Sequence, residues 1–302
     1  MISINNVVKE FDGYMAVNNV SLDMKEGLVF GLIGTNGAGK STLLRMMSGV
    51  LKADQGDITI DELPVYDNPK AKEKIFFIAD EPYFFPHGNA KDMEAYYSMV
   101  YPTFDKERFY KLLEAFDLDP KRKIATFSKG MKKQLALLTG LAAKTDYLYM
   151  DETFDGLDPV MRQAAKSLLA SEIGERNMTP IIASHNLREL EDICDTVGLL
   201  HKGGILLSRD LDDMKLNLQK IQCVFKEENG LEEALNLLEV VRKEQTGSLY
   251  TLTVRGTRDE IITKLSTIDT IFAESLPLTL EEIFICETEV AGYDIKKLIL
   301  GA

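Results

Sequence analysis

The chain has 302 residues, enough for about two domains, and 45% of them are hydrophobic, enough to build buried cores. Its formal net charge is -13, from 48 acidic and 35 basic residues, which argues against nucleic-acid binding because affinity for phosphate backbones comes largely from Lys and Arg. Three scattered cysteines without a C-x-x-C pair indicate a reducing compartment rather than a disulfide framework or a zinc site.

The chain begins with two segments, 2–8 and 20–24, that alternate apolar and polar residues. This pattern is typical of strands with one solvated face, and it predicts an antiparallel edge to a sheet. Phe11 and Tyr14 lie between the two segments. Either ring can stack on a purine base or pack in the core, and the residues alone do not separate these roles.

A glycine-rich stretch at 34–42, G-T-N-G-A-G-K-S-T, satisfies the phosphate-loop pattern G-x-x-x-x-G-K-[ST]. The apolar run before it predicts a buried strand, and 41–48 predicts a helix whose N-terminus faces the anion. Glycines let backbone N–H groups converge on phosphate oxygens, Lys40 adds a cation, and Ser41 offers a hydroxyl to Mg²⁺. The residues expected to bind nucleotide here are Asn36, Gly37, Ala38, Gly39, Lys40, Ser41 and Thr42.

The pattern changes near Asp80, after strand candidates at 57–60 and 75–79. Pro82, Pro86 and Gly88 interrupt it, and helical spacing of apolar residues follows. The sequence therefore predicts a helical insert at about 80–142, too short for an independent domain. Its expected helices span 91–101, 105–116 and 128–141.

A second group of candidate site residues follows a buried strand predicted at 147–150. Asp151 and Glu152 stand at its carboxyl end, where charged groups are costly unless they meet a cation or a ligand. We expect Asp151 to hold Mg²⁺, directly or through water, and Glu152 to polarise an attacking water. After a helix at 160–175 and a strand at 180–184, His185 occupies the strand end at which ligands bind in α/β sheets, as a γ-phosphate contact.

Strands predicted at 196–200 and 205–208 complete a first domain, and a linking helix follows at 210–218. The remaining segments are ordered β-α-β-β-α-β with an added helix, which is the split βαβ pattern of ferredoxin-like domains. This part of the sequence contains no phosphate loop and no metal-binding motif, so regulatory, dimerising and stabilising roles all remain open. The expected elements are 221–226, 231–238, a hairpin at 240–254, 259–268, 272–276 and a helix from Leu280.

In this order, the motifs resemble those of the ATP-binding subunits of ABC transporters. The loop at 34–42 matches Walker A, 147–152 matches Walker B with its catalytic glutamate, and 156–159 matches the D-loop. His185 matches the switch histidine. The segment 127–131, F-S-K-G-M, occupies the place of the Leu-Ser-Gly-Gly-Gln signature that separates this family from other P-loop proteins.

The resemblance covers residues 1–215 closely and implies a fold of the α/β class. It implies a P-loop ABC ATPase domain there, with a mixed sheet, an antiparallel edge and the helical subdomain. Residues 216–302 are expected to form a small α+β ferredoxin-like accessory domain. In the ATPase domain, Lys40, Glu152 and His185 are the expected catalytic residues.

The signature retains Ser128 and Gly130 but replaces Leu, the first Gly and Gln. Ser128 at the start of a helix can still offer its hydroxyl and nearby N–H groups to a phosphate. The nearby Lys129, Lys132 and Lys133 are expected to form a solvated helix face. The retained residues therefore predict that phosphate recognition survives the change.

Two further positions follow from the resemblance. The aromatic that stacks on adenine aligns best with Phe11, with Tyr14 as the fallback. The glutamine that touches Mg²⁺ and the attacking water aligns with Asp80. A carboxylate can contact the metal through water, although it carries a charge and has a shorter reach.

The resemblance also implies partners. Two ABC subunits, identical or different, bind head to tail, so that the loop at 34–42 of one and Ser128 and Gly130 of the other enclose ATP and Mg²⁺. Their opening and closing drive separate integral membrane permease subunits, which we expect to dock near 80–101, where 83–85 form an aromatic cluster. The segment 278–284 resembles the tail of bacterial exporter-type (ABC-2-like) subunits, which favours export of a drug, peptide or lipid.

No apolar run approaches the roughly 18 residues that span a bilayer, so we expect a cytoplasmic protein, peripheral on the inner face of the membrane through its permease. One alternative is a soluble ABC protein that uses ATP-driven dimerisation to regulate a non-membrane partner. Another is a small-molecule kinase, which is disfavoured because it leaves Ser128, Gly130 and His185 without roles.

Overall fold

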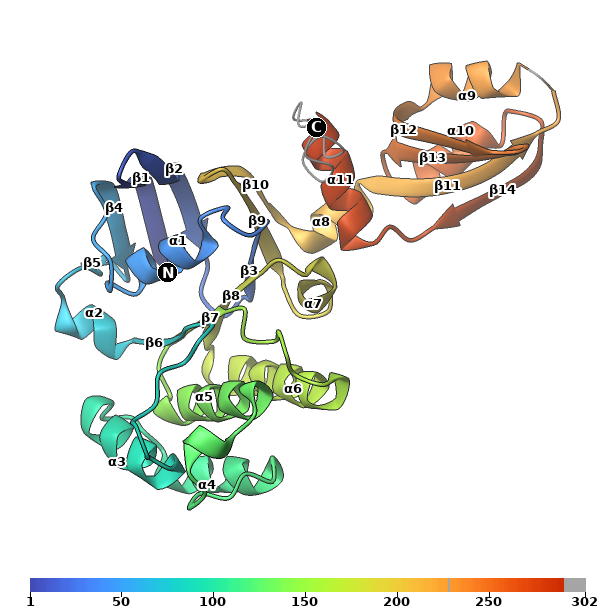
Figure 1. Ribbon diagram of the computed structural model, residues 1–302. Coiled ribbons are helices and arrows are strands. Elements are labelled where there is room, and N and C mark those ends of the chain that lie inside the picture. Colours follow the sequence, from blue (N-terminus) through green and yellow to red (C-terminus); the bar gives the residue numbers. More distant parts are fainter. Residues whose placement is uncertain (228, 291–302) are drawn as a thin grey trace. The chain divides into compact units, whose positions relative to one another are not determined.

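The chain divides into two compact units, Met1–Ser208 and Arg209–Ala302 (Figure 1). The computed structural model describes residues 1–227 and 229–290, so the last part of the predicted domain 216–302 lies outside the described residues. The division falls before the predicted boundary after residue 215. The reason is that α8 (Leu211–Leu216) contacts β11 (Leu218–Phe225) and α11 (Leu280–Val290), which places it in the second unit.

The first unit contains two sheets. The predicted antiparallel strands form a four-stranded sheet of their own, in the order β2-β1-β4-β5. The second sheet has six strands in the order β10-β9-β3-β8-β7-β6, and the neighbours from β9 to β6 are parallel. The strands are β1 (Ile2–Phe11), β2 (Tyr14–Met24), β3 (Phe30–Ile33), β4 (Gln55–Ile60), β5 (Leu63–Pro64), β6 (Ile75–Ile78), β7 (Tyr147–Asp151), β8 (Thr179–Ser184), β9 (Thr196–His201) and β10 (Gly204–Asp210).

One helix, α1 (Lys40–Met47), contacts strands of both sheets. Its buried side chains Leu43, Leu44, Met46 and Met47 share one core with apolar residues from both sheets. Because the phosphate loop leads directly into α1, this core fixes the helix that carries Lys40 and Ser41. Outside the helical insert, the first unit also contains α2 (Pro69–Glu73), α6 (Pro159–Arg176) and α7 (Leu187–Glu191).

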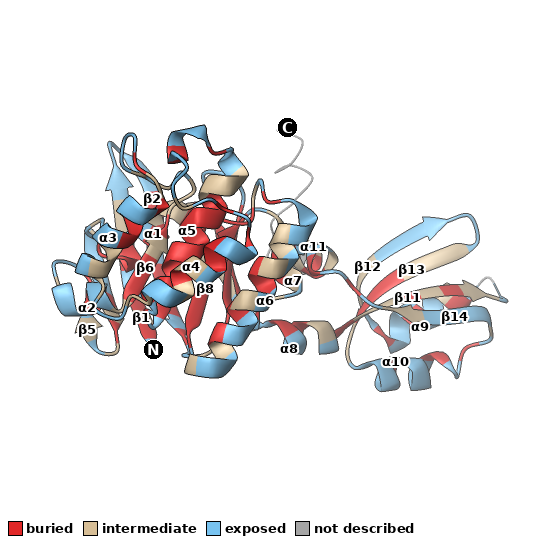
Figure 2. Ribbon diagram, turned by 90° about the horizontal axis from the view of Figure 1, so that it is seen from below, coloured by how far each residue is buried: buried red, intermediate tan, exposed pale blue. Residues whose placement is uncertain are grey.

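The predicted helical insert forms three α-helices and a short 3₁₀ turn. Asn89 begins the first helix with a capping box, and the side chains of Asp105 and Ser128 cap the other two. The third helix is buried along most of its length, as its colour in Figure 2 shows. The elements are α3 (Ala90–Val100), α4 (Lys106–Ala115), the turn Ile124–Thr126 and α5 (Lys129–Ala143).

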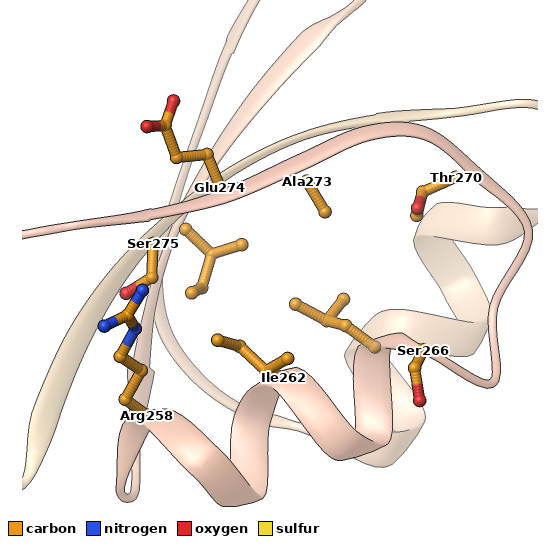
Figure 3. A pocket seen from close by; sticks show the side chains of 9 residues that line it. Arg258, Ile262, Ser266, Thr270, Ala273, Glu274 and Ser275 are labelled. Carbon is orange, nitrogen blue, oxygen red and sulfur yellow. The ribbon is translucent and has the colours of Figure 1, made fainter.

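In the second unit, the described residues form a four-stranded sheet in the order β12-β13-β11-β14, with antiparallel neighbours throughout. The element order agrees with the expected split βαβ pattern, since α9 and α10 follow the first and third strands. A pocket of about 320 Å³ opens between α10 and β14 over Ile221 and Leu265, with Arg258 beside Ser275 at one end (Figure 3). The elements are α9 (Gly230–Leu237), β12 (Glu239–Thr246), β13 (Leu249–Arg255), α10 (Arg258–Leu265) and β14 (Thr270–Leu276).

Cys194, Cys223 and Cys286 are all buried, as is common for cysteine, which packs as a small apolar side chain. Over the described ranges 1–227 and 229–290, no helix is both long and apolar enough to cross a membrane.

A polar network holds the turn between β4 and β5, at Asp61. Its carboxylate accepts hydrogen bonds from Lys74 (2.5 Å), Tyr147 (2.7 Å) and the Met1 amine (2.6 Å). Burial alone would raise the pKa of Asp61, but the hydrogen bonds from Lys74, the Met1 amine and Tyr147 outweigh it and lower the pKa far below its usual value. The charged form of Asp61 therefore stabilises the folded state.

We expect Asp61→Asn to lower the free energy of unfolding by about 1–2 kcal/mol at pH 7, because the amide loses charge-assisted hydrogen bonds. A depressed pKa stabilises the fold above the unfolded-state pKa, and this contribution disappears as pH falls through the folded-state pKa. The difference from wild type, measured by urea unfolding, should therefore shrink below about pH 4. Asp57→Asn is the matched control, since Asp57 is exposed in β4. A difference that stays constant down to pH 2 would contradict this assignment.

Candidate active site

The phosphate loop connects β3 to α1 through backbone conformations that favour glycine. Gly37 has φ of 78° and Gly39 has φ of 106°. A Cβ on Gly39 would lie 2.3 Å from the carbonyl oxygen of Ala16, so no larger residue fits there without moving the backbone. Packing against β2 therefore requires glycine at this point of the predicted nucleotide site.

Lys40 is the first residue of α1, and its side chain is buried. Its Nζ donates to the carbonyl oxygens of Gly34 at 2.7 Å and Thr35 at 3.3 Å, and it lies 3.2 Å from Oε1 of Glu152. The ammonium group is thus held inside the loop by acceptors that surround it. A phosphate in the loop would meet this cation directly.

Asp151 ends β7 with only 1% of its surface exposed. Burial raises the pKa of Asp151, and the opposing hydrogen bond from the Ser41 side chain is the smaller effect. Its Oδ1 atom is buried without a hydrogen-bond partner. An orphaned carboxylate oxygen beside a serine hydroxyl is a donor set that Mg²⁺ prefers. These two residues therefore fit the predicted metal site.

The rest of a metal shell would have to come from elsewhere. Within residues 1–227 and 229–290, no group of three or more His, Cys, Asp or Glu side chains is placed to hold a metal ion. Mg²⁺ is usually held by one or two protein oxygens together with substrate phosphates and water. Ser41 and Asp151 are consistent with a metal that arrives with a nucleotide.

Glu152 directly follows β7 and has a left-handed backbone, with φ of 47°. Its N–H donates to the carbonyl oxygen of Ala183 in β8 at 2.9 Å. Its carboxylate lies between two basic groups, with Oε1 at 3.2 Å from Lys40 Nζ and Oε2 at 2.9 Å from His185 Nδ1. Because β7 and β8 are parallel neighbours, their carboxyl ends bring Glu152 and His185 together. The structure thus joins the three predicted catalytic residues.

Both candidate adenine-stacking rings are exposed at the hairpin between β1 and β2. Phe11 pairs with Tyr14 across the turn, and Lys9 Nζ lies 5.3 Å from the centre of the Phe11 ring. The Tyr14 hydroxyl donates to the carbonyl oxygen of Gly37 at 3.1 Å. The structure therefore places the fallback residue directly on the phosphate loop, and the choice between the two rings stays a prediction.

The signature residues form a separate feature at the start of α5. Ser128 is exposed and its Oγ accepts from the Met131 N–H at 3.2 Å. A Cβ on Gly130 would lie 2.8 Å from the carbonyl oxygen of Gly156, so the helix start packs closely on the loop at 155–158. Within the described part of the chain, no hydrogen bond or ion pair joins Ser128 to Lys40, Glu152 or His185.

The expectation that Lys133 belongs to a solvated helix face is wrong, because only 1% of Lys133 is exposed. Its Nζ donates to Oδ1 of Asp80 at 2.9 Å and to the carbonyl oxygen of Glu152. A usable signal existed in the sequence, since Leu137 and Leu141 follow at helical spacing and are fully buried. Asp80, the predicted metal contact, is thus engaged by a lysine, and its contact with Mg²⁺ stays a prediction.

The predicted docking cluster lines a pocket of about 290 Å³ between the loop after β6 and the helices α3 and α5. Tyr83 is 73% exposed, and Phe85 and Tyr96 are also at the surface. Their rings meet edge to face, with Phe85 and Tyr96 centroids 5.2 Å apart. Exposed rings that are already fixed against one another are typical of protein interfaces.

Comparisons with known proteins agree with this geometry. Residues 17–155 match the family described as ABC transporter. The ABC transporter ATP-binding protein YtrB of Bacillus subtilis is 31% identical over 95% of this chain and 98% of YtrB. The bacitracin transport ATP-binding protein BcrA of Bacillus licheniformis is 30% identical over 73% of each chain. The linearmycin resistance ATP-binding protein LnrL of Bacillus subtilis is 31% identical over 78% of this chain and 77% of LnrL.

Solved structures show the same fold. A dimeric ATP-binding cassette, MJ0796, in a post-hydrolysis state bound to ADP and Pi aligns with a TM-score of 0.63 and 22% identity, over 70% of this chain and 99% of that one. A structure described as the ATP binding subunit of an ABC transporter aligns with a TM-score of 0.66 and 23% identity, over 71% of this chain and 92% of that one. The YtrB match extends over nearly the whole chain, whereas the matches to BcrA, LnrL and the two solved structures cover 70–78% of it.

Proposed function

Because the chain belongs to the ABC transporter family, we propose that this ATPase powers a separate membrane permease and that the complex exports a drug, peptide or lipid. The observation that carries the ATP-hydrolysing part of the proposal is the placement of Glu152 between Lys40 and His185 at the carboxyl ends of β7 and β8. This arrangement joins a phosphate-binding cation, a carboxylate that can polarise water and a histidine at one point. It is suited to the transfer of a γ-phosphoryl group to water.

Each residue has a distinct task in this proposal. Lys40 and the backbone of 36–42 bind the phosphates, and Phe11 or Tyr14 stacks on adenine. Ser41 and Asp151 hold Mg²⁺, which neutralises phosphate charge when it is bound. Glu152 orients and polarises the water, and His185 contacts the γ-phosphate. Positioning and charge neutralisation supply most of the catalysis, since phosphoryl transfer needs little covalent help from the protein.

We also propose that the site is completed by a second ABC subunit, in the simplest case a second copy of this chain. Ser128 is exposed at the N-terminus of the fifteen-residue helix α5, and among the described residues no hydrogen bond joins it to Lys40, Glu152 or His185. A serine at a helix N-terminus offers a hydroxyl and backbone donors to a phosphate. In a head-to-tail pair, Ser128 and Gly130 close over the γ-phosphate that is bound in the partner's loop.

The permease is proposed to dock on Tyr83, Phe85 and Tyr96. We expect Tyr83→Ser to lower the fraction of the chain that is recovered with membranes by about fivefold or more, because truncation of a central aromatic anchor typically costs about 1 kcal/mol or more of binding. Turnover of the free chain should stay unchanged. Tyr66→Ser is the matched control, because Tyr66 is also exposed in the first unit but is outside this cluster. Equal membrane recovery for both variants would contradict the docking assignment.

Export is favoured because BcrA is named for bacitracin transport and LnrL for linearmycin resistance. The test is recovery of the native complex in detergent, followed by identification of its other chains. An integral membrane protein whose presence stimulates Mg-ATP turnover is the expected result. A soluble protein as the sole partner would favour the alternative, in which ATP-driven dimerisation regulates a non-membrane target.

A further inference from the structure

A buried lysine lies behind the catalytic carboxylate, outside the set of residues that would touch ATP. Lys133 is on α5, five positions after the cap residue Ser128, and its side chain is almost completely enclosed. A lysine is rarely fully buried unless its charge is paired, because removing an ammonium group from water is costly. The groups that Lys133 meets therefore indicate why it is retained there.

The ammonium group of Lys133 meets two segments that are distant from α5 in sequence, the loop at Asp80 and the loop at 152–155. It donates to Oδ1 of Asp80 at 2.9 Å and to the backbone carbonyl of Glu152, and it lies 4.0 Å from Oδ2 of Asp155. Asp80 begins the loop that carries the exposed aromatic cluster, and Asp155 begins the loop that packs on Gly130. Lys129 also lies 3.3 Å from Asp155 and ties this loop to the start of α5.

We propose that Lys133 is a positioning residue that fixes the backbone of Glu152 and couples it to the loops that begin at Asp80 and Asp155. Glu152 has a left-handed backbone that few residues adopt, so its carbonyl needs an external partner to keep the carboxylate aimed between Lys40 and His185. Lys133 provides that partner from a helix that is itself buried. A shift of α5 or of the loop after Asp80 then moves Glu152 with it.

This connection has two consequences. Ser128 is on the same helix as Lys133, so contact between Ser128 and a partner's nucleotide is transmitted to this chain's own Glu152. Asp80 adjoins the proposed docking cluster, so permease contact is transmitted to the same carboxylate. Both consequences rest on the proposed function, whereas the link between Lys133 and Glu152 does not.

The test compares steady-state Mg-ATP turnover of full-length variants. We expect Lys133→Met to lower kcat by about 10- to 100-fold, by analogy with the loss seen when a residue that orients a metal ligand is removed. The KM for ATP should stay within about twofold of wild type, because the nucleotide-binding loop at 34–42 is untouched and only catalytic positioning is lost. Lys132→Met is the matched control, because Lys132 is adjacent on α5 and has no side-chain ion pair among the described residues; its kcat should be that of wild type.

Asp80→Asn is a second variant that tests the same link. Asp80 is about half exposed, so its substitution should not prevent folding. If Asp80 acts through Lys133, the double variant should lose no more kcat than the worse single variant. Losses that multiply would mean that Asp80 acts on the nucleotide or metal separately, and would overturn the coupling.

An unchanged kcat in Lys133→Met, or equal losses in Lys132→Met, would overturn the positioning role. If Lys133→Met does not fold, an unchanged kcat in Asp80→Asn alone overturns the proposal. Equal membrane recovery of Tyr83→Ser and its control would remove only the proposed docking partner, because the kcat test does not depend on a permease.

Discussion

Glu152→Gln is expected to reduce steady-state ATP turnover by about a hundredfold or more, because the amide can no longer polarise the attacking water. Binding of Mg-ATP should persist, since Lys40, Ser41 and Asp151 remain. The substitution also removes the negative charge that lies 3.2 Å from Lys40 Nζ, which leaves that cation free to meet phosphate. We therefore expect an ATP-bound dimer to accumulate, measured by size-exclusion chromatography with light scattering and by the nucleotide content of the dimer peak.

The matched control is Glu175→Gln, which removes the charge of an exposed glutamate near the end of α6. Its turnover and oligomeric state should be those of wild type. Unchanged turnover in Glu152→Gln would sink the catalytic assignment. Loss of ATP binding together with turnover would assign Glu152 to nucleotide binding instead.

Lys40→Met is expected to have the second large effect, at the binding step. Removal of the ammonium should weaken Mg-ATP binding by about 10- to 100-fold, because a hydrogen bond to a charged group contributes about 1.5–3 kcal/mol. The apolar stem of Met fills the same buried space, so the free energy of unfolding should change little. Equilibrium binding of a fluorescent ATP analogue measures the loss directly.

Lys52→Met serves as the control for Lys40→Met, since Lys52 is exposed in the same unit and its Nζ lies 5.7 Å from the centre of the Tyr66 ring. Its ATP affinity should equal that of wild type. Retained affinity in Lys40→Met would show that the loop at 34–42 does not bind the phosphates. Both variants lose one positive charge, so the ratio of their ATP affinities separates the effect of the lysine's place in the site from the effect of overall charge.

The parts of the site that were predictable are those set by local pattern and sheet topology. Glycine spacing around Lys40, and acidic or histidine residues directly after apolar strands, are visible in the sequence. Parallel strands place their carboxyl ends at one edge, which brings Glu152 to His185 without knowledge of any side-chain contact. The same reasoning predicted the order of elements in the second unit.

The parts that could not be predicted depend on contacts between distant segments. Lys133 looked like a solvated lysine among other lysines, because the acceptors that enclose it come from Asp80 and Glu152, 53 and 19 residues away. The network at Asp61 likewise draws on Tyr147, 86 residues along the chain. Helical spacing with Leu137 places Lys133 on the core side of α5, but it does not reveal which polar groups its ammonium contacts there.

The most direct test of the composite site is complementation between two inactive variants. Lys40→Met chains retain Ser128, and Ser128→Arg chains retain the phosphate loop, so each alone should hydrolyse little ATP. A mixed pair, isolated through two different tags, contains one intact loop opposite one intact Ser128. We predict that Mg-ATP turnover reappears in that mixed pair. Failure of the two chains to associate, or a mixed pair as inactive as its parents, would contradict a site shared between two copies of this chain.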